Sequence, residues 1–228
     1  MLLGWMLSAL LAMSVPTNSD ARALAMRLDA HYHNVRTLQA VFLERYIEGG
    51  QTVRVESGTV YFSRPSRMRW DYESPEKKLF LVDGKNVWFY VPADHTATRQ
   101  TVKESDDWRT PLALLTGRVR LDRLCGTVAL LPAGLPGDTA SASVGDQVLL
   151  CAPRASSQES AQFRDVLLEI DSSARLVRAV IRQAGAQELE FRFGDWRENL
   201  PLAEDEFHFA PPPGVAIVEA SQLLAARP

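Results

Sequence analysis

The sequence predicts an α+β domain dominated by one strongly curved antiparallel sheet. Helical periodicity is confined to two stretches, near residues 20–46 and 107–118, which are too few for alternating β–α–β units. Strand-like runs separated by turn signals occupy most of the remaining chain. Several of these runs are apolar on both faces. This pattern indicates a sheet that curls around helices and leaves a concave apolar space between them.

The first element has helical character from Asp20 towards Tyr46. Ser19 or Asp20 can cap its start. Its apolar residues recur at intervals of three or four positions, at Leu24, Leu28, Tyr32, Val35, Leu38 and Phe42. The sequence does not determine where this helix ends, because the segment "LQAVFLERYIE" can equally be a strand.

The pattern changes to strand alternation from residue 53 onward. Pro65 cannot donate to a strand ladder and therefore fits a junction between two strands. In the next run Met68 and Trp70 share one face, while Arg67 and Arg69 share the other. We expect the two arginines to lie on a solvated outer surface.

The second half of the chain reads as further antiparallel strands. Asp83-Gly84 predicts a hairpin between "KLFLV" and "NVWFYV", because this dipeptide tolerates positive φ. Thr110 and Pro111 favour the start of a short helix, with Thr110 as its N-cap. Strand-like runs follow near residues 124–131, 147–152, 163–170, 175–183 and 187–193, and a Pro-rich stretch with a last short strand closes the domain.

The composition is that of a globular protein without a basic excess. The 228 residues are 46% hydrophobic and 23% charged, with a formal net charge of −3. A nucleic-acid-binding surface usually shows a basic excess, so we expect no nucleic-acid partner. Nothing in the sequence divides residues 23–228, which we expect to form a single domain.

The N-terminus carries a nearly unbroken apolar run from Leu2 to Val15. Its length is short for a membrane span and fits the apolar region of a signal peptide, which we assign to residues 1–22. No Lys or Arg precedes the run, so an N-terminal membrane anchor or a partly buried helix remains an alternative. Export would bring Cys125 and Cys151 into an oxidising compartment, where either a disulfide or two buried thiols is compatible with the sequence.

Signals for catalysis and for cofactors are missing from the sequence. There is no G-x-S-x-G elbow, phosphate loop or dinucleotide fingerprint. His31 and His33 stand two positions apart, so on a helix they point to different faces and do not form a metal pair. The cysteines match no zinc pattern. We therefore expect a protein that is not an enzyme and that holds no metal or cofactor.

The central segment nevertheless resembles a known family in the order and spacing of its motifs. "SGTVYFSRPSRMRWDYESPEKKLFLVDGKNVWFYVPADHTAT", followed by "RTPLALLTG", resembles the LolA family of periplasmic outer-membrane lipoprotein carrier proteins. The matching positions are Gly58, Arg64-Pro65, Trp70, Pro75, Asp83-Gly84-Lys85, Trp88, Tyr90 and Thr110-Pro111. "FHFAPPPGVAIVE" resembles the closing motif of the family.

The resemblance implies an incomplete β-barrel closed by helices that act as a lid over an apolar cavity. That cavity takes the acyl chains of lipoproteins from an inner-membrane release transporter and carries them to an outer-membrane receptor. The arginine of the family's Arg-Pro step holds the lid closed, and it corresponds to Arg64. The residue four positions later is often aromatic in the family and is Met68 here, which leaves the fit of the acyl chain open.

Taken together, these observations predict a monomeric periplasmic carrier of lipid-modified proteins. A lipid- or glycolipid-binding sensor module with the same fold is the alternative. Strand parity alone does not separate cavity residues from core residues. The candidates for the acyl-chain cavity are Met68, Trp70, Leu79, Leu81, Trp88 and Tyr90.

Overall fold

The computed structural model describes residues 17–102, 112, 115, 120–131, 145–153, 163–183 and 185–219. Its helical elements are α1 (Asn18–Asn34), η1 (Pro92–Asp94), α2 (Leu121–Leu124) and η3 (Glu204–Phe207). Its strands are β1 (Thr37–Glu48), β2 (Gln51–Ser63), β3 (Arg67–Ser74), β4 (Lys78–Val82), β5 (Asn86–Val91), β6 (Thr96–Thr101), β7 (Cys125–Leu131), β8 (Gln147–Pro153), β9 (Asp165–Ile170), β10 (Leu176–Arg182), β11 (Gln187–Glu198) and β12 (Ala216–Glu219).

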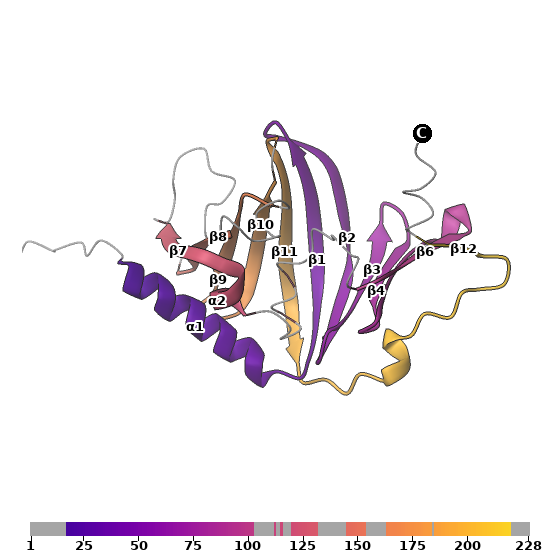
Figure 1. Ribbon diagram of the computed structural model, residues 1–228, viewed down its shortest axis with the longest axis horizontal. Coiled ribbons are helices and arrows are strands. Elements are labelled where there is room, and N and C mark those ends of the chain that lie inside the picture. Colours follow the sequence, from indigo (N-terminus) through magenta and orange to yellow (C-terminus); the bar gives the residue numbers. More distant parts are fainter. Residues whose placement is uncertain are drawn as a thin grey trace, which may run out of the picture.

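The described strands form one open, curved sheet in the order β12-β6-β5-β4-β3-β2-β1-β11-β10-β9-β8-β7. Its edge strands, β12 and β7, lie at opposite ends of the molecule (Figure 1). Neighbouring strands are antiparallel apart from β12, which runs parallel to β6. The predicted fold class is therefore confirmed: the sheet is an incomplete antiparallel barrel, and few helices accompany it in the described ranges.

The helix α1 packs against the concave face of the sheet, next to β7 and β8. A capping box starts it, in which Thr17 and Asp20 each bind the other's backbone N–H. Leu24, Leu28 and Tyr32 form its buried face. The helix ends at Asn34, and the segment that the sequence left open is the strand β1, whose inward residues alternate with outward ones.

Trp70 lies at the centre of the concave face and is fully buried. Its ring centroid lies 4.8 Å from that of Phe42 and 5.3 Å from that of Phe191. Phe62 and Phe193 contact it from further strands at 6.1 and 6.2 Å. Aromatic side chains bury the largest apolar areas, so this cluster holds β3 against β1, β2 and β11 on the concave face.

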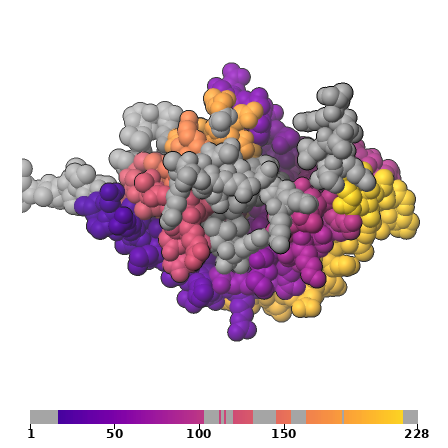
Figure 2. All heavy atoms as spheres, viewed as in Figure 1, coloured from indigo at the N-terminus to yellow at the C-terminus, as the bar shows by residue number. Residues whose placement is uncertain are grey.

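The convex face of β3–β6 is covered by the C-terminal strap, which we define as residues 199–215 and which leads into the edge strand β12. Phe209 of the strap lies 5.2 Å from Trp88 and 5.3 Å from Tyr90, centroid to centroid. Phe207 and Leu81 complete this outer core. Figure 2 shows the yellow strap against the magenta strands at one end of the molecule and indigo α1 at the other. Each half of the sheet is thus covered on a different face.

The two arginines of β3 hold this strap and do not form a solvated surface, which corrects the expectation from strand parity. Arg69 Nη1 donates to the carbonyl oxygen of Glu206 at 2.9 Å, and its Nε donates to the carboxylate of Asp71. The guanidinium of Arg67 lies 5.3 Å from the ring centroid of Phe207, a cation–π distance. Parity placed both residues on the outer face correctly. It could not show that a later segment covers them.

Gly58 marks a place where β2 and β3 come unusually close. A Cβ atom at this position would lie only 1.9 Å from the carbonyl oxygen of Asp71. The pairing of β2 with β3 also shifts register between Ser57 and Gly58. Such a bulge bends a strand and increases its twist, so this glycine helps the sheet to curve.

A disulfide joins Cys125 of β7 to Cys151 of β8, with Cα atoms 5.2 Å apart. Both cysteines are buried within the core of the concave face. Of the two alternatives left open by the sequence, the structure therefore has the disulfide. It ties the edge strand β7 to the rest of the sheet.

Some expectations fall on residues outside those described. These are the apolar run from Leu2 to Val15 and the helix near residues 107–118, apart from Leu112 and Leu115, which are buried in the concave-face core. The signal peptide therefore stays a prediction. None of the helices in the described ranges is both long and apolar enough to cross a bilayer.

We predict that Gly58→Ala destabilises the protein by about 1–3 kcal/mol, because the new methyl group forces β2 and β3 apart. Gly194→Ala is the matched control, since its Cβ would meet Val41 at an ordinary 3.4 Å. Chemical denaturation of both variants measures the difference. Equal stabilities would contradict the role assigned to Gly58.

Replacing Cys125 and Cys151 together by serine should lower the free energy of unfolding by about 3 kcal/mol, because the bond spans 26 positions. Thermal unfolding with and without reductant checks this: reductant should destabilise the wild type and leave the double variant unchanged. Free thiols in the unreduced wild type, detected by alkylation and mass spectrometry, would contradict the assignment.

Candidate functional site

An apolar track leads from the core of the concave face towards its open side. The strand register pairs Trp70 with Phe80 and Phe80 with Phe89, so the three side chains share the concave face. Their exposed fractions rise along the track, from 0% for Trp70 to 3% for Phe80 and 37% for Phe89. The last of these presents a large apolar surface at the edge of a cavity, which is where an apolar ligand would enter.

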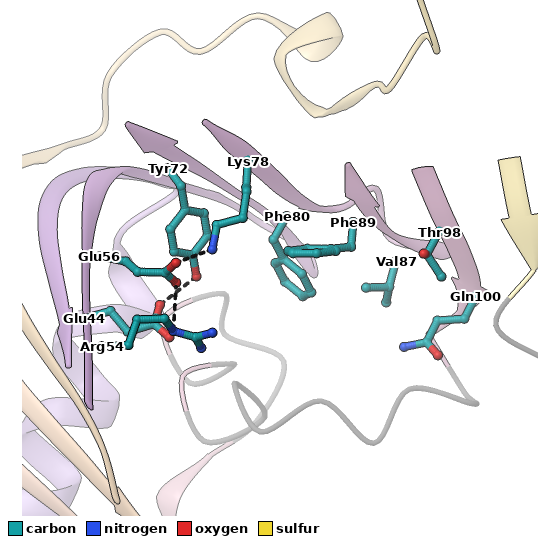
Figure 3. A pocket seen from close by; sticks show the side chains of 10 residues that line it. All are labelled: Glu44, Arg54, Glu56, Tyr72, Lys78, Phe80, Val87, Phe89, Thr98 and Gln100. Atoms are coloured by element: carbon teal, nitrogen blue, oxygen red, sulfur yellow. Dashed lines mark hydrogen bonds and ion pairs between the residues drawn. The ribbon is translucent and has the colours of Figure 1, made fainter. Parts of the chain in front are cut away.

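This cavity has a volume of about 290 Å³ and opens on the concave face of β1–β6 (Figure 3). Small-molecule sites commonly measure about 300–1,000 Å³, so it has room for a modest part of a ligand. Its middle is apolar and polar side chains stand at both ends. The lining residues are Glu44, Arg54, Glu56, Tyr72, Lys78, Phe80, Val87, Phe89, Thr98 and Gln100.

One end of the cavity carries a cluster of charged and polar side chains, which we call the charged end: Glu44, Arg54, Glu56, Tyr72 and Lys78. Lys78 Nζ forms an ion pair with Glu56, and Arg54 Nε lies 3.7 Å from the other carboxylate oxygen of Glu56. The hydroxyl of Tyr72 donates to Glu44 Oε2 at 2.7 Å. Both glutamates are buried, so these partners offset part of the cost of removing the carboxylates from water.

Arg64 lies in the turn between β2 and β3 and reaches the last turn of α1. Its Nη2 donates a hydrogen bond to the carbonyl oxygen of Tyr32. Carbonyls in the last turn of a helix have no partner within the helix, so a guanidinium is well suited to bind one. Burial lowers the pKa of Arg64 from its ordinary value, but a guanidinium starts so far above neutrality that it stays protonated.

Further polar contacts hold α1 on the other half of the sheet. His31 Nε2 lies 2.9 Å from Glu198 Oε1, and the backbone N–H of Leu176 donates to the Tyr32 hydroxyl at 2.8 Å. Burial raises the pKa of Tyr32, so its hydroxyl stays protonated. Asp29 accepts the N–H of Leu121 at the start of α2, and burial raises the pKa of this carboxyl. A hydrogen bond contributes only about 0.5–1.5 kcal/mol to stability, or about 1.5–3 kcal/mol when one partner is charged, so α1 is held by several modest contacts.

The structure divides the candidate cavity residues between the two faces of the sheet. Met68 and Trp70 lie on the concave face, where both belong to the core cluster. Four others lie on the convex face and pack against the strap, so they do not line the concave cavity: Leu79, Leu81, Trp88 and Tyr90. The physical reason is strand alternation, because Leu81 pairs with Arg69 and with Trp88, and all three side chains point away from Trp70. Leu79 and Tyr90 line a separate cavity beside the strap, and a binding role for the four residues stays a prediction.

Sequence reasoning missed Phe80, Val87 and Phe89, which form the apolar middle of the cavity. A signal for them was present, because the hairpin at Asp83-Gly84 fixes Phe80 opposite Phe89. The sequence did not show which side of that hairpin faces inward. Which side of the hairpin faces inward depends on the register in which β4 pairs with β3.

Among the described residues, no group of three or more His, Cys, Asp or Glu side chains is arranged to hold a metal ion. His31 and His33 lie in the last turn of α1, and His31 contacts Glu198.

Comparison with known proteins finds relatives along most of the chain. The family profile described as "Outer membrane lipoprotein carrier protein LolA" matches residues 33–128. An outer-membrane lipoprotein carrier protein of Nitrosomonas europaea is 30% identical over 207 residues, which cover 90% of this chain and 91% of that protein. Its counterpart in Nitrosospira multiformis is 29% identical over 194 residues, covering 84% of this chain and 86% of that protein.

A solved structure supports the fold independently. An uncharacterized conserved protein from Thermus thermophilus superimposes with a TM-score of 0.53 and 14% sequence identity. The match covers 87% of this chain and 98% of that one. At this level of identity the likeness concerns the fold alone.

The opposite orientations of Trp88 and Phe89 give a matched pair of variants. Phe89→Ser should weaken binding of a fluorescent fatty-acid probe roughly 10-fold, because an apolar contact worth about 1.4 kcal/mol is lost. Its effect on stability should be below about 1 kcal/mol, since the side chain is 37% exposed. Probe titration and chemical denaturation measure the two quantities.

Trp88→Ala should show the reverse behaviour. Its side chain is buried against Phe209, so its loss should cost about 3–5 kcal/mol of stability. The folded fraction of the Trp88→Ala protein should bind the probe with the affinity of the wild type. Weaker probe binding by Trp88→Ala than by Phe89→Ser would overturn the assignment of the two faces.

Proposed function

Because the chain belongs to the LolA family of outer membrane lipoprotein carrier proteins, we propose that it binds the acyl chains of lipid-modified proteins on the concave face of its sheet. In this proposal it receives them from a release transporter in the inner membrane and delivers them to a receptor in the outer membrane. It acts in the periplasm as a monomeric carrier and performs no catalysis.

The energetics of acyl chains explain why such a carrier is needed. Each methylene group kept out of water contributes about 0.8 kcal/mol, so one long chain represents on the order of 10 kcal/mol. A lipid-modified protein therefore cannot cross an aqueous compartment unless an apolar surface covers its chains. The track from Trp70 through Phe80 to Phe89 supplies such a surface, and its position on the concave face is the single observation that supports the proposal most directly.

The cavity in this structure is too small for several acyl chains, so uptake requires a wider space. Moving α1 away from β7 and β8 would open the neighbouring part of the concave face and extend the space beyond β1–β6. The bond from Arg64 to the Tyr32 carbonyl would have to break. This contact is worth about 1.5–3 kcal/mol, far less than the burial of one acyl chain. The entering lipid can therefore open the latch, and the re-forming latch favours release.

Two further observations agree with a periplasmic location. The apolar run at the N-terminus is of a length that fits a signal peptide. The disulfide between Cys125 and Cys151 is of a kind that persists in oxidising compartments, the bacterial periplasm among them.

Isolation of the protein from the periplasm, followed by mass spectrometry of the bound molecules, tests the proposal. We expect acylated proteins to co-purify, and we expect the added carrier to release lipoproteins from inner-membrane spheroplasts. A protein that is always lipid-free and releases nothing would refute the carrier function. Bound free lipid or glycolipid in place of acylated protein would favour the sensor module instead.

We predict that Arg64→Leu uncouples uptake from delivery. Loss of the charged hydrogen bond should raise the opening of α1 by roughly 10- to 100-fold, as measured by hydrogen exchange of its amides. Uptake of an acyl-chain probe should be retained, whereas transfer of bound lipoprotein to outer membranes should fall, because the closed state no longer competes with the lipid.

Arg36→Leu is the matched control, since the side chain of Arg36 is exposed next to the same helix end. This variant should behave as the wild type in both assays. Unchanged transfer by Arg64→Leu would show that Arg64 is not the latch.

A further inference from the structure

The charged end of the cavity has no evident role in binding hydrocarbon. Glu44 and Glu56 are 2% and 5% exposed and stand on the same concave face as Phe80. A buried ion pair contributes little stability by itself, and apolar side chains of similar volume are often equal or better. A surface that only bound acyl chains would therefore be better served by apolar residues at these positions.

The charged end is also directly continuous with the apolar middle of the cavity. Lys78 and Phe80 come from the same strand and line the same space, with Tyr72 beside them on β3 (Figure 3). A chain lying against Phe80 and Phe89 would thus have its end, or the group attached to it, next to Lys78 and Arg54. The cavity is built for a molecule that is apolar along its length and polar at one end.

The balance of charges indicates what kind of polar group fits there. Two carboxylates and two cations make up the cluster, Glu44 and Glu56 with Arg54 and Lys78, so their formal charges cancel. Such a site does not favour a strongly charged headgroup. An ammonium has three N–H donors and a guanidinium has five, so Lys78 and Arg54 have more donors than their contacts with Glu56 use. Carbonyl oxygens can accept these donors, and a carboxylate can accept an amide N–H.

We propose that the charged end is a second subsite, which binds the neutral ester and amide groups where acyl chains join the lipid-modified end of a polypeptide. This inference rests on the proposed carrier function and deepens it. The apolar track provides affinity for any acyl chain. The charged end distinguishes an acylated peptide, which has amide groups beside its esters, from a free fatty acid with its carboxylate and from a phospholipid with its phosphate.

The test compares three probes on the full mature chain: a synthetic dipalmitoylated cysteinyl peptide, palmitic acid and vesicles of dipalmitoyl phosphatidylglycerol. The double variant Glu56→Gln/Lys78→Met removes the ion pair at nearly constant volume and unchanged net charge. We expect it to bind the lipopeptide about 10-fold more weakly than the wild type does, with its affinity for palmitic acid unchanged.

Glu76→Gln/Lys77→Met is the matched control, because it makes the same chemical change at two exposed neighbours outside the cavity. Thermal unfolding establishes that each variant is folded. If the first double variant is not folded, Arg54→Met replaces it, since the Arg54 side chain is 55% exposed and its loss should leave the fold intact.

The outcomes separate the subsite from the carrier function. If the double variant Glu56→Gln/Lys78→Met loses affinity equally for all three probes, or for none of them, the subsite is overturned and the carrier function still stands. A wild type that prefers palmitic acid or the phospholipid to the lipopeptide would also overturn the subsite. A wild type that binds none of the probes would count against the carrier function itself.

Discussion

The structure depends on one constraint: an open sheet that is apolar on both faces must have both faces covered. In a small closed barrel the inward side chains pack against one another, so the inner face needs no separate cover. Here α1 covers part of the concave face and the C-terminal strap covers the convex face of β3–β6. The coverage is unequal, and the concave face of β1–β6 keeps a cavity edged by Phe89. The candidate site is therefore a part of the apolar concave face that the described elements leave accessible.

This constraint gives a physical meaning to two motifs that stand far apart in the sequence. The aromatic residues of "WFY" on β5 alternate between the faces, so Trp88 and Tyr90 point outward and Phe89 points inward. The strap motif "FHF" alternates in the same way and turns Phe209 towards Trp88 and Tyr90. Residues that look like a ligand site when read alone are one half of an outer core. The other half lies more than a hundred positions later.

The three arginines near β3 illustrate how position decides the function of one residue type. Arg67 and Arg69 bind the strap through a ring face and a backbone carbonyl, and they fasten the convex side. Arg64 binds a backbone carbonyl of α1 on the concave side. All three are anchors for segments that cover the sheet. The contact of Arg64 differs because the segment it holds covers the face where the cavity opens, so the same kind of bond can serve as a latch.

Local sequence patterns predicted many of the strands and turns of this protein. Strand alternation, the Asp83-Gly84 turn and the junction at Pro65 predicted the sheet, and parity placed Arg67 and Arg69 opposite Trp70. The order of the motifs indicated the family and singled out Arg64. Only the tertiary structure decided which face of each strand lies inward, that the strap covers the convex side, that Cys125 and Cys151 are joined and that Glu56 and Lys78 form the end of a cavity. The physical reason is that alternation is a property of a single strand, whereas the identity of the concave face depends on pairing and curvature between segments distant in the chain.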